Sequence, residues 1–180
     1  MSLLQDAPLL AHCDNWPDIS FGTWFVLRTK ARQEKILAHD LDARGIGNFL
    51  PLVTCTKFYG GRRARVELPL FPGYVFLRGD VDQAYEADRT RRVAQIIRVP
   101  DQRRMDDELR NIHIALGANA TLDPYPFLRA GVRVEVREGP FRGLQGVVED
   151  RTRLDRLILL VDTLGQAVSL EIDGSLLDVV

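Results

Sequence analysis

The sequence predicts an α+β domain with an antiparallel sheet, followed by a small all-β barrel. Strand-like and helix-like patterns alternate in the first two thirds of the chain, and only short strand patterns occur after residue 129. A proline-containing segment separates the two parts. We therefore expect a tail over residues 1–20, a first domain over 21–118, a linker over 119–128 and a second domain over 129–180. A chain of 180 residues is long enough for two small domains.

The first domain is predicted to pack around the stretch Leu68–Arg78, which reads LPLFPGYVFLR. Its first half contains two prolines and a glycine, so it is not expected to form an ordinary central strand. Its second half, Tyr74–Leu77, is aromatic and β-branched, which is typical of a buried strand. On these residues alone, the stretch is a core strand that follows a rigid bend.

Apolar periodicity and turn residues predict the other elements of this domain. The expected strands cover residues 23–28, 49–58, 65–68, 74–77 and 93–99, and the expected helices cover about 32–44, 82–91 and 105–116. Met105, Leu109, Ile112 and Leu116 follow helical spacing. Gly60-Gly61 between two strand patterns predicts a hairpin, and either Asp80 or Asp82 is expected to cap the second helix.

The second domain is predicted to be a small barrel built from short strands. Residues 132–136 alternate strictly between apolar and polar side chains, and strand patterns recur at 147–149, 157–161 and 168–172. A glycine-rich turn lies between the first two strands. The segment Arg153–Leu159 could also wind as a helix, but the alternation at 132–136 favours the barrel as the resting state.

Composition is that of an ordinary globular protein, with 46% hydrophobic and 27% charged residues. The apolar runs are too short for a membrane span, and the N-terminus does not resemble a secretory signal. Cys13 and Cys55 match no metal or redox spacing, and His12 beside Cys13 makes a poor metal site. We therefore expect a cytoplasmic monomer without a metal or cofactor.

Charge is distributed unevenly between the two domains. Residues 21–118 carry 17 Lys and Arg against 12 Asp and Glu, whereas residues 129–180 carry 7 against 9. Most of the basic residues are arginines, which suit bidentate phosphate contacts. A coding bias toward arginine is an alternative explanation.

Two motifs carry a resemblance to a known family. PLFPGYVFLR resembles the segment that marks the NGN domain of NusG-family transcription elongation factors, and VRVEVREGPFRGLQGVVED resembles a KOW motif. Their order, with a proline-containing linker between them, makes the combination more specific than either motif. The resemblance implies an NGN-type α/β sandwich followed by an SH3-like KOW barrel. The motif spacing looks closer to specialised paralogues of the RfaH and UpxY type than to the general factor.

The resemblance implies that the first domain binds RNA polymerase. In this family an apolar depression binds the clamp helices of the β′ subunit, and the domain bridges to the β lobe. The residues at the matching positions are Phe25, Phe71, Pro72 and Tyr74, with Phe76 expected in the core. Phe71 and Tyr74 are expected to lie closest to the partner. Alternate residues of a strand must point into the domain, so a purely structural role is the competing interpretation.

The resemblance also implies contacts with the non-template DNA strand and with upstream DNA. The basic residues at the matching positions are Lys30, Arg32, Lys35, Arg91 and Arg92, with Arg62 and Arg63 at the hairpin tip. Phosphate contacts would explain Lys and Arg at these places. A solvated helix face and a solubilising turn are equally consistent with these residues. Residues 83–88, where RfaH has a polar run that meets the β subunit, depart from that pattern.

KOW barrels of this family recruit ribosomal protein S10 or the termination factor Rho. The matching edge here comprises Leu164, Gly165, Gln166 and Ala167. We expect an elongation factor that binds RNA polymerase and suppresses pausing or termination. The alternatives are a general NusG that acts with Rho and a KOW-type RNA- or ribosome-binding module, the latter disfavoured by the acidic second domain. No catalytic motif appears, so we expect no enzyme activity.

Overall fold

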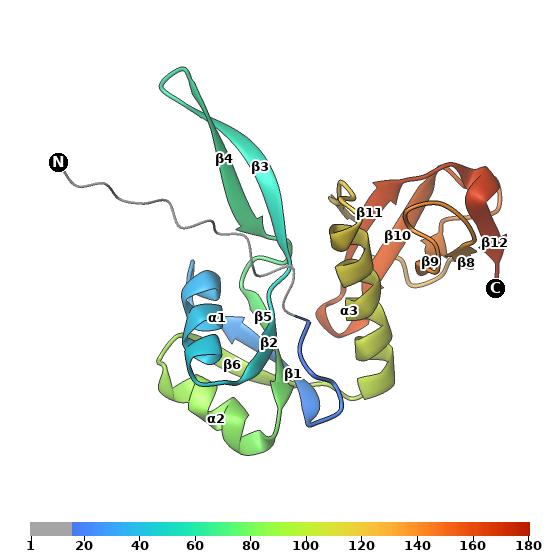
Figure 1. The fold of residues 1–180 in the computed structure, drawn as a ribbon. Coiled ribbons are helices and arrows are strands. Elements are labelled where there is room, and N and C mark those ends of the chain that lie inside the picture. Colours follow the sequence, from blue (N-terminus) through green and yellow to red (C-terminus); the bar gives the residue numbers. More distant parts are fainter. Residues whose placement is uncertain (1–15) are drawn as a thin grey trace.

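The computed structural model describes residues 16–180 (Figure 1). Its first part contains β1 (Thr23–Thr29), α1 (Glu34–Ala43), β2 (Gly47–Phe49), β3 (Leu52–Tyr59), β4 (Arg62–Pro69), β5 (Tyr74–Gly79), α2 (Val81–Arg89), β6 (Val93–Arg98) and α3 (Gln102–Gly117). Its second part contains β7 (Asp123–Tyr125), β8 (Val132–Val136), β9 (Gln145–Val148), β10 (Arg156–Val161), β11 (Gln166–Glu171) and β12 (Leu177–Val179), with 3-10 turns η1 (Asp162–Leu164) and η2 (Gly174–Leu176). The predicted α+β fold class is confirmed.

The first part is built on an antiparallel sheet with strand order β2-β5-β1-β6. Because side chains alternate along each strand, the two faces of this sheet form separate cores. One face packs on α1 and α2 through residues such as Leu27 and Leu77. The other packs on α3 through residues such as Val26 and Phe76. The apolar cluster on the α3 side continues into the second part, where it includes Leu159 of β10.

Helices α2 and α3 begin where a polar side chain satisfies one of their first backbone N–H groups. Asp80 caps α2: its carboxylate accepts from the N–H of Gln83, and the Gln83 side chain accepts from the N–H of Asp80. Asp101 caps α3, which therefore begins at Gln102, three residues before the predicted start. The apolar spacing alone located the middle of α3 but not its polar first turn.

A buried carboxylate holds the bend at Gly73, within the stretch Leu68–Arg78. Glu34, in the first turn of α1, is 8% exposed. Its Oε1 accepts a hydrogen bond from the N–H of Gly73 at 2.7 Å. The carbonyl of Gly73 accepts from the N–H of Thr29 at 2.8 Å, and Gly73 adopts a φ of 87°. The bend between Pro72 and Tyr74 is therefore fixed from two elements.

Strands β3 and β4 form a separate two-stranded hairpin that projects from the first domain (Figure 1). Tyr59 pairs with Arg62 across the two-residue turn Gly60-Gly61. Both glycines have positive φ, as the tight turn of a twisted hairpin requires. Near the tip the side chains of both strands are exposed.

The residues that precede β1 pack against the first domain. Trp16 lies against three rings, with centroid distances of 5.1 Å to His113, 5.4 Å to Phe49 and 5.7 Å to Trp24. Part of the predicted tail is therefore ordered. His12 and Cys13 lie outside the described residues.

The same N-terminal segment is fixed by Arg78 of β5. Its guanidinium donates to the carbonyl oxygens of Ile19 and Phe21 at 2.8 and 3.0 Å. The guanidinium also lies 5.5 Å from the centroid of the Trp24 ring. Arg78 thus links the N-terminal segment to the sheet.

The second part is a small β structure with strand order β12-β8-β9-β10-β11-β7. Its core includes Val134, Val136, Leu157 and Leu170. Residues 156–159 of the segment that could also wind as a helix lie in strand β10. Strand β7 comes from the predicted linker, so the linker is partly structured. Among the described residues, no helix is long and apolar enough to cross a membrane.

Candidate functional site

Phe25 and Phe71 lie on opposite faces of the first sheet, so the four residues predicted to bind polymerase do not form one surface. Phe25 is 7% exposed and belongs to the core beneath α1 and α2. Phe71 is 2% exposed and packs edge-on against Phe76 in the core beneath α3. The prediction that Phe25 shares one surface with Phe71, Pro72 and Tyr74 is therefore corrected. Its neighbours Trp24 and Val26 face α3, so alternation turns Phe25 the other way.

Of the four residues predicted to bind polymerase, the accessible ones lie in the turn that follows Phe71. Pro72 is exposed, and Tyr74 is half-buried against the core on the α3 side. Phe71 lies beneath them rather than at the surface, and Phe76 is fully buried as predicted. The hydrogen bond from Gly73 to Glu34 fixes the direction in which Pro72 and Tyr74 point. We refer to residues 71–74 as the aromatic turn.

The predicted basic residues from two separate loops lie together beside α1. The N–H of Lys30 donates to the carbonyl oxygen of Arg92 at 2.8 Å, which joins the β1–α1 loop to the α2–β6 loop. Arg32 and Arg91 occupy these two loops, both are exposed, and their φ angles are 61° and 62°. Lys30, Arg32 and Arg91 form no ion pair with any described residue. We refer to these three residues as the basic loop pair.

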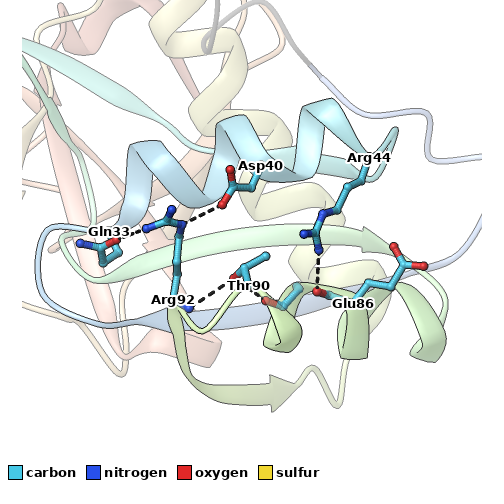
Figure 2. Close-up of polar contacts among 7 residues, drawn as sticks. Gln33, Asp40, Arg44, Glu86, Thr90 and Arg92 are labelled. Carbon is cyan, nitrogen blue, oxygen red and sulfur yellow. Dashed lines mark hydrogen bonds and ion pairs between the residues drawn. The ribbon is translucent and has the colours of Figure 1, made fainter.

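Arg92 and Lys35 are engaged in contacts inside the domain. Figure 2 shows the Arg92 side chain donating to Asp40 at 2.7 Å and to Gln33 at 2.6 Å. The Lys35 ammonium donates to the carbonyl oxygen of Glu67 in β4 at 2.5 Å. Both residues thus fix α1 and its neighbours in place, a role that the sequence pattern did not distinguish from DNA binding.

The hairpin tip carries more candidate residues than Arg62 and Arg63. The cations of residues 56–65 are Lys57, Arg62, Arg63 and Arg65, and this segment contains no carboxylate. Phe58 and Tyr59 are 66% and 59% exposed. The sequence contained a signal for these residues, because two aromatic side chains directly before the predicted Gly60-Gly61 turn have no core to enter at a hairpin end.

Each face of the hairpin tip presents one aromatic ring and two cations. Phe58 pairs with Arg63 and Tyr59 pairs with Arg62 in the strand register. Cross-strand partners share a face, and residues two apart do also. One face therefore holds Phe58, Arg63 and Arg65, and the other holds Tyr59, Arg62 and Lys57. The guanidinium of Arg63 lies 5.6 Å from the centroid of the Phe58 ring.

The predicted partner-binding edge of the barrel is partly covered by the chain itself. Leu164 and Gln166 are half-buried, Gly165 is exposed, and Ala167 is 5% exposed. Ala167 pairs with Tyr125 of β7. The linker strand therefore occupies part of the edge that the motif positions indicate.

Polar contacts join the barrel to α3 beside this edge. Glu108 Oε2 accepts from the N–H of Asp162 at 3.0 Å, and the Arg104 guanidinium lies 3.3 Å from the Asp162 carboxylate. Asn111 Oδ1 accepts from the N–H of Gln145 at 3.1 Å. A cavity of about 640 Å³ lies next to these contacts and is lined by residues of α3 and of the barrel.

Replacing Glu108 with glutamine is expected to remove a pH dependence of stability above pH 4.5. Burial penalises the charged carboxylate and raises the pKa of Glu108, although the Asp162 N–H and Arg104 partly oppose that effect. The folded protein then keeps a proton that the unfolded chain releases, so the free energy of unfolding falls as the pH rises through this window. Urea unfolding at a series of pH values measures this slope.

The matched control for this prediction is Asp107→Asn, which changes an exposed carboxylate of the same helix. This variant is expected to keep the wild-type slope. An unchanged slope in Glu108→Gln would show that the Glu108 carboxyl has no raised pKa in the folded protein.

A family model described as "Transcription termination factor nusG" matches residues 22–112, which is half of the chain. The chain belongs to the NusG family. The NusG match runs from the start of β1 into α3, so it contains the aromatic turn, the hairpin and the basic loop pair. A similar protein is the transcription termination/antitermination protein NusG of Lactococcus lactis subsp. lactis (strain IL1403). It is 27% identical over 166 residues, covering 83% of this chain and 89% of that protein.

The NusG family comprises transcription elongation and termination factors, and these factors are not enzymes. The predicted membership of the NusG family is confirmed by these comparisons. Among the described residues, no group of three or more His, Cys, Asp and Glu side chains is arranged to hold a metal ion.

Proposed function

We propose that this NusG-family protein is an elongation factor that binds RNA polymerase through the aromatic turn of its first domain. The observation that carries this proposal is the geometry of residues 71–74. Pro72 and Tyr74 are presented at the surface, Phe71 supports them from the core, and Glu34 fixes the bend. A rigid aromatic turn loses little conformational entropy on binding, and aromatic residues dominate the energy of protein interfaces.

We further propose that the basic loop pair contacts the non-template DNA strand in the transcription bubble. A left-handed backbone costs a non-glycine residue about 1–2 kcal/mol, yet arginine occupies this conformation at both Arg32 and Arg91. Strain of this kind is typical of functional sites. The exposed cations come from two loops that the backbone hydrogen bond of Lys30 joins. Such a cluster of cations suits binding to the flexible, negatively charged non-template DNA strand.

We propose a specialised antitermination role on the basis of the aromatic turn and the basic loop pair. A factor that contacts both polymerase and the non-template strand holds the elongation complex in one conformation, which we expect to shorten pauses. The second candidate function is assistance to Rho, and it is favoured by the description of the matched family as a termination factor. For either role, we propose that the barrel recruits a protein partner, which is ribosomal protein S10 or Rho.

Replacing Tyr74 with alanine is expected to weaken binding to a reconstituted bacterial elongation complex at least about tenfold, as for a truncated interface hot spot. Pause shortening should be lost to the same degree. Phe21→Ala is the matched control, since Phe21 is 57% exposed before β1, and its affinity should remain within about twofold of wild type. Fluorescence anisotropy measures the affinity, and a transcription time course measures the pauses. Equal affinities for the two variants would contradict the proposed surface.

The non-template contact is tested on the same complex. Replacing Lys30, Arg32 and Arg91 with glutamine should reduce pause shortening on an open bubble but not binding to polymerase without nucleic acid. The control replaces three exposed barrel arginines, Arg129, Arg142 and Arg151, and has the same change in charge. Adding Rho separates the two roles, because an antitermination factor lowers termination at Rho sites and a Rho assistant raises it.

A further inference from the structure

The projecting hairpin of β3 and β4 has two chemically different faces (Figure 1). Cross-strand partners lie on the same face of a ribbon, and so do residues two apart in one strand. The strand register therefore gathers eight side chains on one face, namely Val53, Cys55, Lys57 and Tyr59 of β3 with Arg62, Ala64, Val66 and Leu68 of β4. The opposite face carries polar residues such as Thr54, Thr56 and Glu67 along the same length. We refer to the set of eight residues as the ribbon face.

Most apolar side chains of the ribbon face lie outside both cores of the first domain. Val53, at the base of the hairpin, packs against the core cluster beneath α3. Among the described residues, Ala64, Val66 and Leu68 pack against neither core cluster, and each of them is half-buried. A two-stranded ribbon is marginal in water unless another layer packs on its apolar face. The ribbon face therefore has room for a further segment of chain.

The chain before Trp16 begins beside the base of this face. The Trp16 ring lies 5.4 Å from the ring of Phe49, which precedes β3 by three residues. Trp16 and Val53 both pack against the core cluster beneath α3, so the ribbon face opens on the side of the sheet where Trp16 lies. Arg78 fixes the residues that follow Trp16 through the carbonyl oxygens of Ile19 and Phe21. The position from which residues 1–15 extend is thus well defined.

Residues 1–15 are complementary to the ribbon face in chemistry. They contain an apolar run, Leu9–Ala11, and two carboxylates, Asp6 and Asp14, without any Lys or Arg. The hairpin segment 56–65 has the opposite character, with four cations and no carboxylate. Apolar side chains would therefore meet the base of the ribbon face, and Asp6 would meet its cationic end.

The length of the N-terminal segment also matches the ribbon face. A fully extended chain from Leu9 to Trp16 spans about 23 Å, and β3 from Val53 to Tyr59 spans about 20 Å. Residues 9–15 can therefore cover the apolar part of the face without passing its tip. Leu3 lies up to about 43 Å from Trp16 along an extended chain, which is well past the tip.

We propose that residues 6–15 dock on the ribbon face of the same molecule, with Leu9 and Leu10 on its apolar part. Attachment at Trp16 gives the segment an effective concentration of about 1 mM, so a weak intrinsic affinity is sufficient. Docking covers a projecting apolar ribbon that would otherwise attract other chains. The proposal concerns a contact within one chain and goes beyond the proposed function.

The test places a spin label on the N-terminal segment and observes the hairpin by NMR. The chain contains two cysteines, so a variant with Cys13→Ser, Cys55→Ser and Ala7→Cys carries a single thiol. A nitroxide on that thiol is expected to broaden the amide signals of Ala64 and Val66 in the full ¹⁵N-labelled chain. The reduced, diamagnetic label provides the reference intensities.

Two double substitutions decide whether the broadening comes from docking. Leu9→Ser with Leu10→Ser removes the apolar contact, and the hairpin signals should then recover their intensity. Leu3→Ser with Leu4→Ser is the matched control, because it makes the same chemical change in residues that lie past the tip, and it should keep the broadening. All four leucines precede the described residues, so neither variant removes a side chain from the described core.

Hydrogen exchange provides a second measurement that needs no label. In the variant with Leu9→Ser and Leu10→Ser, the hairpin amides should exchange on the order of tenfold faster than in wild type, while amides of β1 and β5 keep their rates. The variant with Leu3→Ser and Leu4→Ser should match wild type at every position.

Two outcomes would overturn the proposal. One is a hairpin whose signal intensities and exchange rates are the same with and without Leu9 and Leu10. The other is broadening between molecules, seen when ¹⁵N-labelled chain without nitroxide is mixed with unlabelled chain that carries it, which would show that a second copy occupies the ribbon face. Neither measurement involves polymerase, so a negative result here does not affect the proposed function, and a failure of polymerase binding does not affect this docking.

Discussion

Replacing Phe71 with alanine is expected to lower the free energy of unfolding by about 3–5 kcal/mol. The ring is 2% exposed and packs edge-on against Phe76, with ring centroids 6.1 Å apart. Truncation removes apolar burial and leaves a cavity between the sheet and α3, and the fixed bend at Gly73 limits how far the backbone can collapse into it. Urea denaturation followed by circular dichroism measures the loss.

Phe58→Ala is the matched control, because the same side chain is 66% exposed at the hairpin tip. Its effect on the free energy of unfolding should stay within about 0.5 kcal/mol. A loss below about 1 kcal/mol in Phe71→Ala would mean that this side chain is not part of the core. The expected result also bears on function, since weaker polymerase binding by Phe71→Ala would include the cost of a destabilised domain. Tyr74 is therefore the better residue for testing the contact.

Removing the four cations of the hairpin tip is expected to weaken binding to forked duplex DNA on the order of 100-fold. The variant replaces Lys57, Arg62, Arg63 and Arg65 with glutamine. A two-stranded ribbon fits a DNA groove, and cations on both of its faces can reach the phosphates on either side. If each cation contacts one phosphate, the slope of log affinity against log salt should become less steep by about 3.6. Fluorescence anisotropy over a salt series measures both quantities.

The control replaces four exposed arginines of the barrel, namely Arg129, Arg133, Arg142 and Arg151, with glutamine. This variant has the same net charge as the hairpin variant and should keep most of the affinity. Equal weakening in both variants would show that binding depends on overall charge rather than on the tip. Replacing Phe58 and Tyr59 with alanine should weaken binding to a single-stranded end without changing the salt slope, because stacking releases few counterions.

The sequence determined most elements of the first domain because short-range patterns specify them. The spacing of Met105, Leu109 and Ile112 defined one face of α3 before its partner in the sheet was known. Gly60-Gly61 predicted the hairpin turn, since few other residues adopt the required φ angles. Asp80 was one of two candidates for the cap of α2, and its hydrogen bond with Gln83 selects it.

The candidate site was less predictable because exposure depends on contacts between distant segments. Phe25 and Phe71 have equally apolar neighbours in the sequence, yet they point into different cores. Arg91 and Arg92 are adjacent, but only Arg92 meets Asp40, which lies 52 positions away in the chain. No local pattern distinguishes a cation that binds a phosphate from one that fixes a helix.

The sequence by itself therefore determined the fold class, the order of the α+β part and the β-rich part, and the family motifs of this protein. These depend on periodicity, turn residues and short motifs that act within about a dozen positions. Only the tertiary structure decided that Glu34 fixes the aromatic turn, that Glu108 meets Asp162 and that β7 covers β11. Those contacts join segments whose approach is set by the packing of whole elements, and a carboxylate or a three-residue strand carries no local sign of its eventual partner.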